Sequence, residues 1–405
     1  MNASVLYLHF IFVPSMRYIH SHITHIIGTY KGEMPLANFL KFYFKKNPIL
    51  GSRDRKIISE MAYCYYRCAK DLEPKSLSLS EQIDASLLLS ESNVHNVLRV
   101  LPENLQSQYG QSFEENLPFL QQLGIYFIKD HLIYNKIAFS SGIQKTEWLN
   151  SMLQRPRLFI RLVPKYKEEV LKLLKEAEVD FKHINDVCLS LANGTAIEKI
   201  IPEKMYRIQD ASSQKTAEYF VIKDNKTCWD CCSGAGGKSL LVKDTAPKCK
   251  LSVSDVRASI LDNLAERFHL YGYPIPERIQ LSVANVEETK LILADRKFDH
   301  IIADVPCSGS GTWARTPEQL YFFNPETLND FSNRQRAIAD NALNYLKPGG
   351  SFIYITCSVF AAENEEIVSD LLFLHPEISL AHQQIINGLE IGADSMFVAV
   401  LKSSN

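Results

Sequence analysis

The chain has 405 residues, of which 46% are hydrophobic and 22% are charged. This composition is ordinary for a globular protein with two or three cores, and it excludes a collagen, a disulfide-rich miniprotein and a disordered tail. The formal net charge of -2 argues against a polybasic arm, although residues 1–205 hold 25 Lys and Arg against 21 Asp and Glu, and residues 206–405 hold 19 against 25.

The start of the chain does not resemble a targeting signal. Its apolar stretch, Val5–Val13, is too short to cross about 30 Å of hydrocarbon and lacks the basic residues of a signal peptide. The nine cysteines are an odd number, which favours a reducing compartment over paired disulfides. We therefore expect a cytoplasmic protein with no membrane partner. One interpretation is that translation starts at Met16, which would make residues 1–15 an artefact of the assigned start.

Residues 1–150 are expected to form a helical domain, because apolar residues recur there at spacings of three and four, as in Ile58, Met61, Ala62 and Tyr65. Residues 151–205 are expected to form a small α/β module. It begins with a strand-like run at 158–163 and continues with a charged helical run at 165–177 and two short apolar runs, 181–184 and 187–191.

The small module contains a basic stretch whose members are Arg155, Arg157, Arg161, Lys165, Lys167, Lys172 and Lys175. Only Glu168 and Glu169 oppose these cations within the stretch. The sequence alone leaves two interpretations open, a solvated face of a helix or a surface that binds phosphates.

Residues 206–405 alternate between strand-like and helical runs from Thr227 onward. The expected strands are 228–232, 251–256, 279–283, 298–305 and 351–356, and the expected helices cover about 258–271 and 328–346. Strand and helix repeated in this way predict an α/β fold with an open, mainly parallel, doubly wound sheet.

A glycine-rich turn follows the first of these strands and opens a helix, in the sequence Asp230-Cys-Cys-Ser-Gly-Ala-Gly-Gly-Lys238. Small residues there let the backbone turn tightly and approach a ligand closely. The second strand ends in Asp255, where this geometry brings a carboxylate within reach of a ribose diol. Together they predict a pocket for an adenosine-type cofactor, although the spacing fits neither a dinucleotide fingerprint nor a P-loop.

Cys228 and Cys231 form a C-x-x-C pair, which raises the possibility of a zinc site. Zinc needs four ligands, and no second C-x-x-C or H-x-x-x-H pair is present to complete them. Buried strand cysteines are therefore the preferred interpretation, and no metal is expected.

Two later strands deliver thiols and a carboxylate at their carboxyl ends. The strand 298–305 leads into Asp304, Pro306 and Cys307, and the strand 351–356 leads into Cys357. Open α/β sheets bind ligands at this edge, so we expect the three groups to lie together beside the cofactor. Methylation of C5 of a pyrimidine needs this set, because C5 becomes nucleophilic only after a thiolate adds to C6. A second thiol then has a role in releasing the product.

These motifs identify a resemblance to the RsmB/NOL1/NOP2/Sun family of RNA cytosine-5 methyltransferases, whose sheet is of the Rossmann-like type. The resemblance covers roughly residues 155–400, and more weakly the helical part, where 32–67 resembles a NusB-like domain. It is carried by the segments 208–214, 230–238, 304–311, 347–350, 356–358 and 363–365, together with Asp255, Arg315 and Pro317.

The resemblance implies a role for each site residue. Cys357 would be the nucleophile, Cys307 the thiol that assists product release, and Asp304 the partner of N3 of the base, which also borders the cofactor. S-adenosylmethionine would be held by Cys232, Ser233, Gly234, Ala235, Gly236, Gly237, Lys238, Asp255 and Asn285. The small module would bind RNA, most simply ribosomal RNA, and the protein is expected to act as a monomer.

Three positions depart from the family pattern. Asn285 replaces the usual acid at the adenine edge, Ala235 replaces a proline in the cofactor loop, and Ala314 replaces one arginine of a pair. An amide oxygen still accepts from the adenine amino group, so weaker cofactor binding is expected and not its loss. The same departures motivate an alternative, an RNA-binding ribosome-assembly protein with a weakened or inactive methyltransferase domain.

Overall fold

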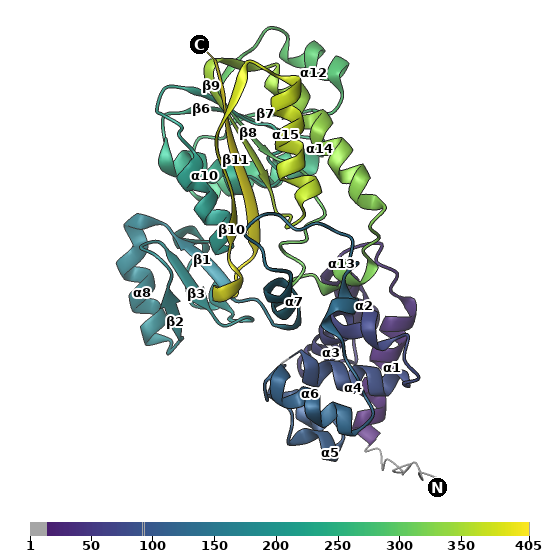
Figure 1. Cartoon of the computed structure of the whole chain (residues 1–405). Helices are drawn as coiled ribbons and strands as arrows, with labels where there is room; N and C mark the ends of the chain where they lie inside the picture. Colours follow the sequence, from purple (N-terminus) through teal and green to yellow (C-terminus); the bar gives the residue numbers. More distant parts are fainter. Residues whose placement is uncertain (1–13, 91, 93, 405) are drawn as a thin grey trace. The chain divides into compact units, whose positions relative to one another are not determined.

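A computed structural model describes residues 14–90, 92 and 94–404 (Figure 1). The stretch before Pro14, which includes Val5–Val13, lies outside the described residues, so the interpretation of Met16 as the start stays a prediction. The chain divides into two compact units. The smaller unit comprises residues 1–135, 149–155 and 313–323, and the larger comprises residues 136–148, 156–312 and 324–405.

The smaller unit is helical, as the spacing of its apolar residues predicts. Its helices are α1 (Pro14–Thr29), α2 (Leu36–Lys46), α3 (Ser52–Leu72), α4 (Leu79–Leu89), α5 (Glu103–Gln106), α6 (Phe113–Gln122), the end of α7 (Lys145–Leu153) and α13 (Pro317–Phe322). Ser78 with Glu81, and Ser112 with Glu115, form capping boxes that satisfy the first amides of α4 and α6. Helix α13 comes from the carboxy-terminal half of the chain, which the apolar spacing of residues 1–150 does not reveal.

The small α/β module belongs to the larger unit. Its sheet has the order β2-β3-β1-β4 and is antiparallel throughout. The strands are β1 (Leu158–Leu162), β2 (Phe181–His183), β3 (Cys188–Leu191) and β4 (Tyr206–Ile208). Helix α8 (Lys167–Glu176) buries Val170 and Leu174 in a core that also contains Ile160 and Leu189. The expected strand, helix and two short apolar runs are therefore present.

A seven-stranded sheet with the order β10-β11-β9-β8-β5-β6-β7 forms the centre of the larger unit (Figure 1). Its strands are β5 (Thr227–Asp230), β6 (Lys250–Asp255), β7 (Glu277–Gln280), β8 (Phe298–Asp304), β9 (Leu346–Thr356), β10 (Ile378–Asn387) and β11 (Ser395–Ser403). The five strands from β5 to β9 are parallel, and β11 runs antiparallel to both β9 and β10.

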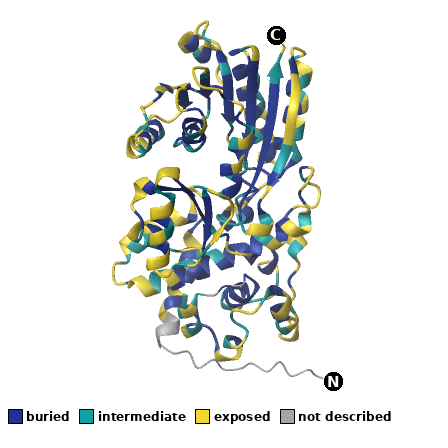
Figure 2. Ribbon diagram, turned by 90° about the vertical axis from the view of Figure 1, so that its left-hand side faces the viewer, coloured by how far each residue is buried: buried dark blue, intermediate teal, exposed yellow. Residues whose placement is uncertain are grey.

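Both faces of the sheet are buried along its inner strands, whereas the edge strands β10 and β7 are largely exposed (Figure 2). Successive side chains of a strand point to opposite faces, so Cys228 enters one core and Trp229 the other. The faces are covered by α10 (Gly237–Thr245), α11 (Ala258–Leu270), α12 (Val286–Leu293), α14 (Thr327–Leu343) and α15 (Glu365–Leu374). The first strand, β5, lies between β6 and β8, which places the switch point of the strand order at its carboxyl end.

The observed elements confirm the predicted α/β fold with a Rossmann-like, mainly parallel sheet. Helix α10 is the helix that the glycine-rich turn was expected to open, whereas the hairpin of β10 and β11 and the helices α12 and α15 were not among the expected elements. Among the described residues, no helix combines the length and apolar character that a bilayer span requires.

Candidate active site

The carboxyl ends of β5, β6, β8 and β9 surround a cavity of about 980 Å³. It is lined by Ser213, Cys231, Cys232, Ser233, Gly234, Ala235, Gly237, Lys238, Asp255, Val256, Arg257, Leu281, Ser282, Val283, Ala284, Asp304, Val305, Pro306, Cys307, Arg334, Ile338 and Cys357. The glycine loop, Asp255, Asp304 and both cysteines thus meet in one space. Of the residues expected at the site, Gly236 and Asn285 do not line this cavity.

The glycine loop has the backbone conformation that its sequence predicts. Gly234 and Gly236 have φ angles of +49° and +82°, which side chains rarely tolerate. A Cβ on Gly236 would lie 2.8 Å from Cγ of Leu264 in α11, so this position also needs glycine for close packing. Arg267 of the same helix donates to the carbonyl oxygen of Ala235 at 2.6 Å and holds the outer side of the loop.

Asp230, at the end of β5, is fully buried behind the loop. Its carboxyl accepts a hydrogen bond from the Ser239 hydroxyl, and its Oδ1 has no hydrogen-bond partner among the described residues. Burial raises the pKa of Asp230 to about 7, and the neighbouring Asp304 adds to this effect. The loop is therefore anchored by an acid that is about half protonated at pH 7.

Asp255 lies at the end of β6 and faces the cavity. Arg257 donates to it from its backbone nitrogen at 2.9 Å and from Nε at 3.0 Å. These bonds orient the carboxylate while leaving acceptor capacity for a hydroxyl pair.

Asn285 is exposed and caps helix α12, where its Oδ1 accepts from the backbone nitrogen of Glu288 at 3.2 Å. Neighbouring residues 282–284 line the cavity in its place. A contact between Asn285 and adenine therefore stays a prediction.

Lys238 connects the cofactor loop to the end of β8. Its Nζ lies 3.2 Å from Oδ2 of Asp304 and 3.0 Å from the Ser213 hydroxyl. The Lys238 side chain is 6% exposed, whereas that of Asp304 is 32% exposed. A buried cation thus holds the carboxylate at the cavity wall, where one face of it remains accessible.

The two cysteines converge although they are fifty positions apart in the chain. Their Sγ atoms lie 3.2 Å from each other, and both residues are only partly buried. The hydrogen bond to Cys357 and burial raise the pKa of the Cys307 thiol well above its ordinary value. Cys307 therefore keeps its proton and can donate it to the sulfur of Cys357.

Glu363 holds the loops that carry the two cysteines. It is fully buried, and its carboxylate accepts from the backbone nitrogen of Ser308 at 2.7 Å and from Gln335 at 2.9 Å. The hydroxyls of Ser308 and Ser358 also donate to it. Because these serines directly follow Cys307 and Cys357, one carboxylate fixes both loops.

Several of these residues were not expected from the sequence. The acidic segment 363–365 was noted as part of the family pattern, but no role was given to it. Ser213 similarly lies in the noted segment 208–214. Arg334 and Ile338 are one helical turn apart on α14, and this i, i+4 spacing beside the thiol loops is the only sequence signal for them.

The C-x-x-C pair contributes to packing. Cys228 and Cys231 are buried in the two cores on opposite faces of the sheet. Within the described part of the chain, no three His, Cys, Asp or Glu side chains gather as a metal site.

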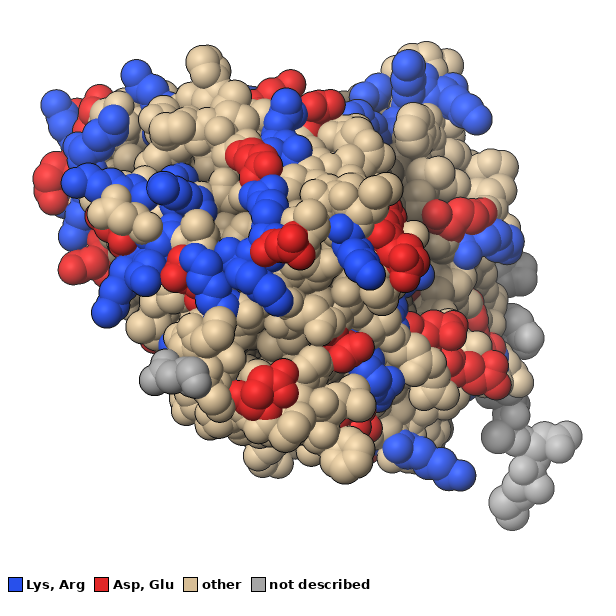
Figure 3. Space-filling view, turned by 90° about the horizontal axis from the view of Figure 1, so that it is seen from above, with Lys and Arg blue, Asp and Glu red and all other residues tan. Residues whose placement is uncertain are grey.

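The basic stretch of the small module is largely occupied by internal contacts. Arg161 is buried and pairs with Asp244, Arg155 pairs with Glu60 at 3.3 Å, and Lys167 lies 3.4 Å from Asp186. Arg157 donates to the Ser190 hydroxyl, and Lys172 lies 3.7 Å from Glu176. On the face seen in Figure 3, carboxylates lie between the lysines and arginines in most places.

The cavity fits a methyl donor of the adenosine type. The loop offers a close backbone approach at Gly234, Asp255 offers acceptors for a ribose diol, and Leu281, Val283 and Val305 form an apolar wall. The strand order, the glycine loop and this wall together define a Rossmann-like, S-adenosylmethionine-dependent methyltransferase domain.

Comparisons with known proteins agree with this class. The sequence model of the family 16S rRNA methyltransferase RsmB/F matches residues 218–402. The ribosomal RNA small subunit methyltransferase B of Klebsiella pneumoniae (strain 342) is 25% identical over 276 residues, which are 65% of this chain and 63% of that protein. The protein of the same name from Enterobacter sp. (strain 638) is 22% identical over 345 residues, or 84% of this chain and 78% of that protein.

Solved structures share the fold. PH0851 superposes with a TM-score of 0.69 at 18% identity, covering 97% of this chain and 100% of that chain. NSun6 from Pyrococcus horikoshii, solved with SFG, gives a TM-score of 0.55 at 14% identity over 64% of this chain and 94% of that chain. The RsmB/F family model thus matches residues 218–402, and the solved structures share the fold of the chain.

Proposed function

We propose that this protein transfers a methyl group from S-adenosylmethionine to C5 of a cytosine in RNA, most simply ribosomal RNA. The observation that carries the proposal is the 3.2 Å separation of the Cys307 and Cys357 sulfurs in the cavity that also contains the glycine loop and Asp304. A methyl transfer to oxygen or to an amino group has no use for two converging thiols, whereas C5 methylation uses both.

Each residue would act on a flipped-out cytosine. The thiolate of Cys357 adds to C6, and the electron pair of the C5=C6 bond makes C5 nucleophilic. Asp304 would act there as a general acid that gives its proton to N3 as C6 is attacked, in the orientation that Lys238 imposes, and then accepts a hydrogen bond from N3–H of the adduct. Bound S-adenosylmethionine would supply an electrophilic methyl group, which C5 takes. Solvent water would then take the C5 proton and Asp304 would take back the N3 proton, which restores the double bond, breaks the S–C6 bond and releases Cys357 as a thiolate.

The roles of the two cysteines follow from their different environments. Cys307 retains its proton because Cys357 accepts it and because burial disfavours the charged form. It is therefore suited to stabilise the Cys357 thiolate before attack and to assist its departure afterwards. This supports Cys357 as nucleophile and Cys307 as the thiol that assists release.

RNA as the substrate is supported by the names of the relatives, which are ribosomal RNA methyltransferases. The small module supplies exposed cations such as Lys165 and Lys175 beside its sheet. A cytoplasmic, monomeric enzyme remains our working assumption for the assay below.

The test uses RNA from cells that lack this protein, purified full-length protein and S-adenosylmethionine with a tritiated methyl group. The wild type should label 5-methylcytidine, and Cys357→Ala should abolish labelling. Cys307→Ala should instead accumulate a covalent protein–RNA adduct that survives denaturing electrophoresis. Cys188→Ala, a buried cysteine of the small module, is the matched control and should label RNA normally.

Three results would overturn parts of the proposal. Label in a nucleoside other than 5-methylcytidine would refute the chemistry. An adduct with Cys357→Ala and normal turnover with Cys307→Ala would reverse the roles of the two thiols. Absence of S-adenosylmethionine binding in calorimetry would favour a ribosome-assembly protein that binds RNA without modifying it.

A further inference from the structure

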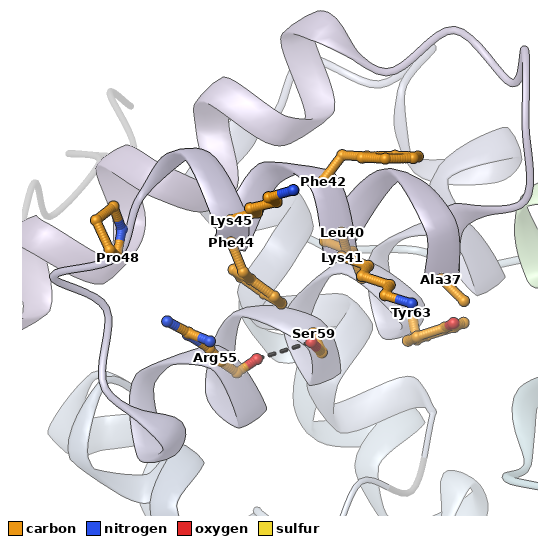
Figure 4. Close-up of a pocket in the computed structure, with 10 residues that line it drawn as sticks. All are labelled: Ala37, Leu40, Lys41, Phe42, Phe44, Lys45, Pro48, Arg55, Ser59 and Tyr63. Carbon is orange, nitrogen blue, oxygen red and sulfur yellow. Dashed lines mark hydrogen bonds between the residues drawn. The ribbon is translucent and has the colours of Figure 1, made fainter.

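A second hollow surface lies in the helical unit, and none of its lining residues belongs to the proposed active site. It is a groove of about 680 Å³ between α2 and α3. We call it the α2–α3 groove, and it is lined by Ala37, Leu40, Lys41, Phe42, Phe44, Lys45, Pro48, Arg55, Ser59 and Tyr63 (Figure 4). No function discussed above uses these residues.

The helices fix the floor of the groove. Leu40 is buried under α2, and Figure 4 shows Phe44 pointing from α2 toward α3, above Arg55 and Ser59. The Arg55 guanidinium lies 5.9 Å from the centre of the Phe44 ring, and its Nε donates to the carbonyl oxygen of Leu50 at 2.8 Å. The cation is therefore held in place with its outer nitrogens directed away from this carbonyl.

The groove is positively charged. Lys41, Lys45 and Arg55 line it, and no carboxylate is among its lining residues. Residues 36–63 contain six Lys and Arg against two acids, and one of the acids, Glu60, is buried and paired with Arg155. This charge favours an anionic ligand over a neutral or cationic one, and several cations along one groove suit a chain of phosphates.

Large apolar side chains stand exposed beside these cations. Phe42 is 57% exposed and Ile49 is 89% exposed. An exposed phenylalanine among cations is the pairing that proteins use for single-stranded nucleic acid, because a base stacks on the ring while lysines contact the phosphates. A duplex offers no free base faces, so it would gain nothing from Phe42.

We propose that the α2–α3 groove binds a single-stranded segment of RNA, with a base stacked on Phe42 and phosphates contacting Lys41, Lys45 and Arg55. The proposal rests on the proposed function only for the kind of polymer. It assigns to the helical unit a binding site that shares no residue with the cavity around Cys307 and Cys357. The enzyme would therefore bind its substrate at two sites.

The experiment measures binding of a fluorescein-labelled 12-nucleotide oligouridylate to the full chain without S-adenosylmethionine. The probe contains no cytosine, so the catalytic cleft is not engaged by its target base. Phe42→Ala should weaken binding about 5- to 100-fold, the range of a lost base stack. Lys41→Glu with Lys45→Glu should weaken it by at least about tenfold and lower the salt slope of log K by about 1.4, or about 0.7 per phosphate contact.

Controls come from the same unit. Tyr126 is 59% exposed and Arg99 is exposed, and neither lines the groove. Tyr126→Ala and Arg99→Glu should leave binding within about twofold of wild type. The groove variants remove only surface side chains, and their unfolding midpoints in urea verify that they are folded.

Three outcomes would refute the proposal. The first is equal binding by the groove variants and the controls. The second is an equal loss for a 12-base-pair duplex, which would indicate a surface that reads phosphates alone. The third is tighter binding of a polyglutamate peptide than of the oligouridylate, which would indicate a protein partner. Because Cys357→Ala should not affect this probe, failure here and failure of the proposed methylation give separate results.

Discussion

Two groups of cations, one in each compact unit, have different surroundings. In the larger unit, Arg161 and Arg207 are buried against the single carboxylate of Asp244, and Lys238 is buried against Asp304. In the helical unit, Lys41 and Lys45 stand exposed at the rim of a groove. The first group positions parts of the protein, whereas the second is available to a ligand.

This difference shows that the density of cations along the chain is a poor guide to their use. The stretch from Arg155 to Lys175 is the more conspicuous one in the sequence, yet most of its members contact carboxylates or hydroxyls of the protein. The segment 36–59 has a comparable number of cations, and its geometry leaves them beside an exposed ring.

The largest effect should come from removing the carboxylate between two buried guanidiniums. Asp244→Ala leaves Arg161 and Arg207 without their shared partner, and we expect a loss of about 3–5 kcal/mol in the free energy of unfolding. Urea denaturation followed by circular dichroism measures it. The surface pair Lys41→Glu and Lys45→Glu should change the same quantity by less than about 0.5 kcal/mol. Equal effects would erase the distinction between the two groups of cations.

Each unit also contains a buried acid whose pKa is raised to about 7, Asp84 in α4 and Asp230 in β5. Burial raises the pKa of Asp84 to about 7 from 3.8, and Glu81 adds to the effect. Between these values the folded state holds more protons than the unfolded state, so stability falls as pH rises toward 7. The full effect is about 4 kcal/mol at most.

Asp84→Asn removes the titrating carboxyl group, so the variant should not show the decrease in the free energy of unfolding that Asp84 causes as pH rises. Its unfolding free energy, measured in urea at pH 5.5 and at pH 8.5, should depend on pH less steeply than that of the wild type. Because Asp84 lies outside the cleft, methyl transfer should be unaffected. A pH dependence identical to that of the wild type would show that the carboxyl of Asp84 is not titrating as its burial implies.

Glu363→Gln should separate positioning from folding. The neutral amide keeps the shape of the side chain but loses the charge that strengthens its bonds from Ser308 and Ser358, worth about 1.5–3 kcal/mol. We expect kcat to fall about 10- to 100-fold with little change in KM, measured by transfer of a tritiated methyl group. The pH dependence of the rate at which an alkylating reagent modifies Cys307 and Cys357 should also change. If the substitution only lowered stability, the molecules that remain folded would show the same pH dependence of alkylation as the wild type.

The smallest effect concerns Asn285. Asn285 caps α12, so Asn285→Ala should lower the free energy of unfolding by about 1 kcal/mol. Asn285→Asp keeps the cap and should leave this free energy nearly unchanged. Calorimetry with S-adenosylmethionine tests the second role expected for this residue. If Asn285 also contacts adenine, both variants will alter the dissociation constant, and if it only caps the helix neither will.

The parallel strands and the groups at their ends could be predicted because their signals are local. Strand 298–304 has an apolar centre at 301–303 and ends in Asp304, and Cys307 and Cys357 follow strand ends, where the topology of a doubly wound sheet brings such groups to one edge. The convergence of the two sulfurs is thus a consequence of strand order, which the alternation of runs already indicates.

Other features depend on contacts between distant parts of the chain and have no local signal. Glu363 is an acid in an acidic segment, and only the folded chain shows that it is fully buried between two serine-bearing loops. Strand β10 was missed because its exposed polar residues resemble a surface loop, although it pairs along its length with β11. The α2–α3 groove arises from the packing of two amphipathic helices, which periodicity alone does not describe.

The helical unit is completed by a segment from the other half of the chain. Glu318 of α13 accepts from the backbone nitrogen of Leu36 at 3.0 Å, Arg67 donates to the carbonyl oxygen of Ala314, and Lys70 donates to that of Leu320. A gene fragment that stops after Arg155 would therefore encode the helices without the segment that contacts α2 and α3. To express the helical unit separately, residues 313–323 would have to be supplied as a separate peptide or as a fused tail.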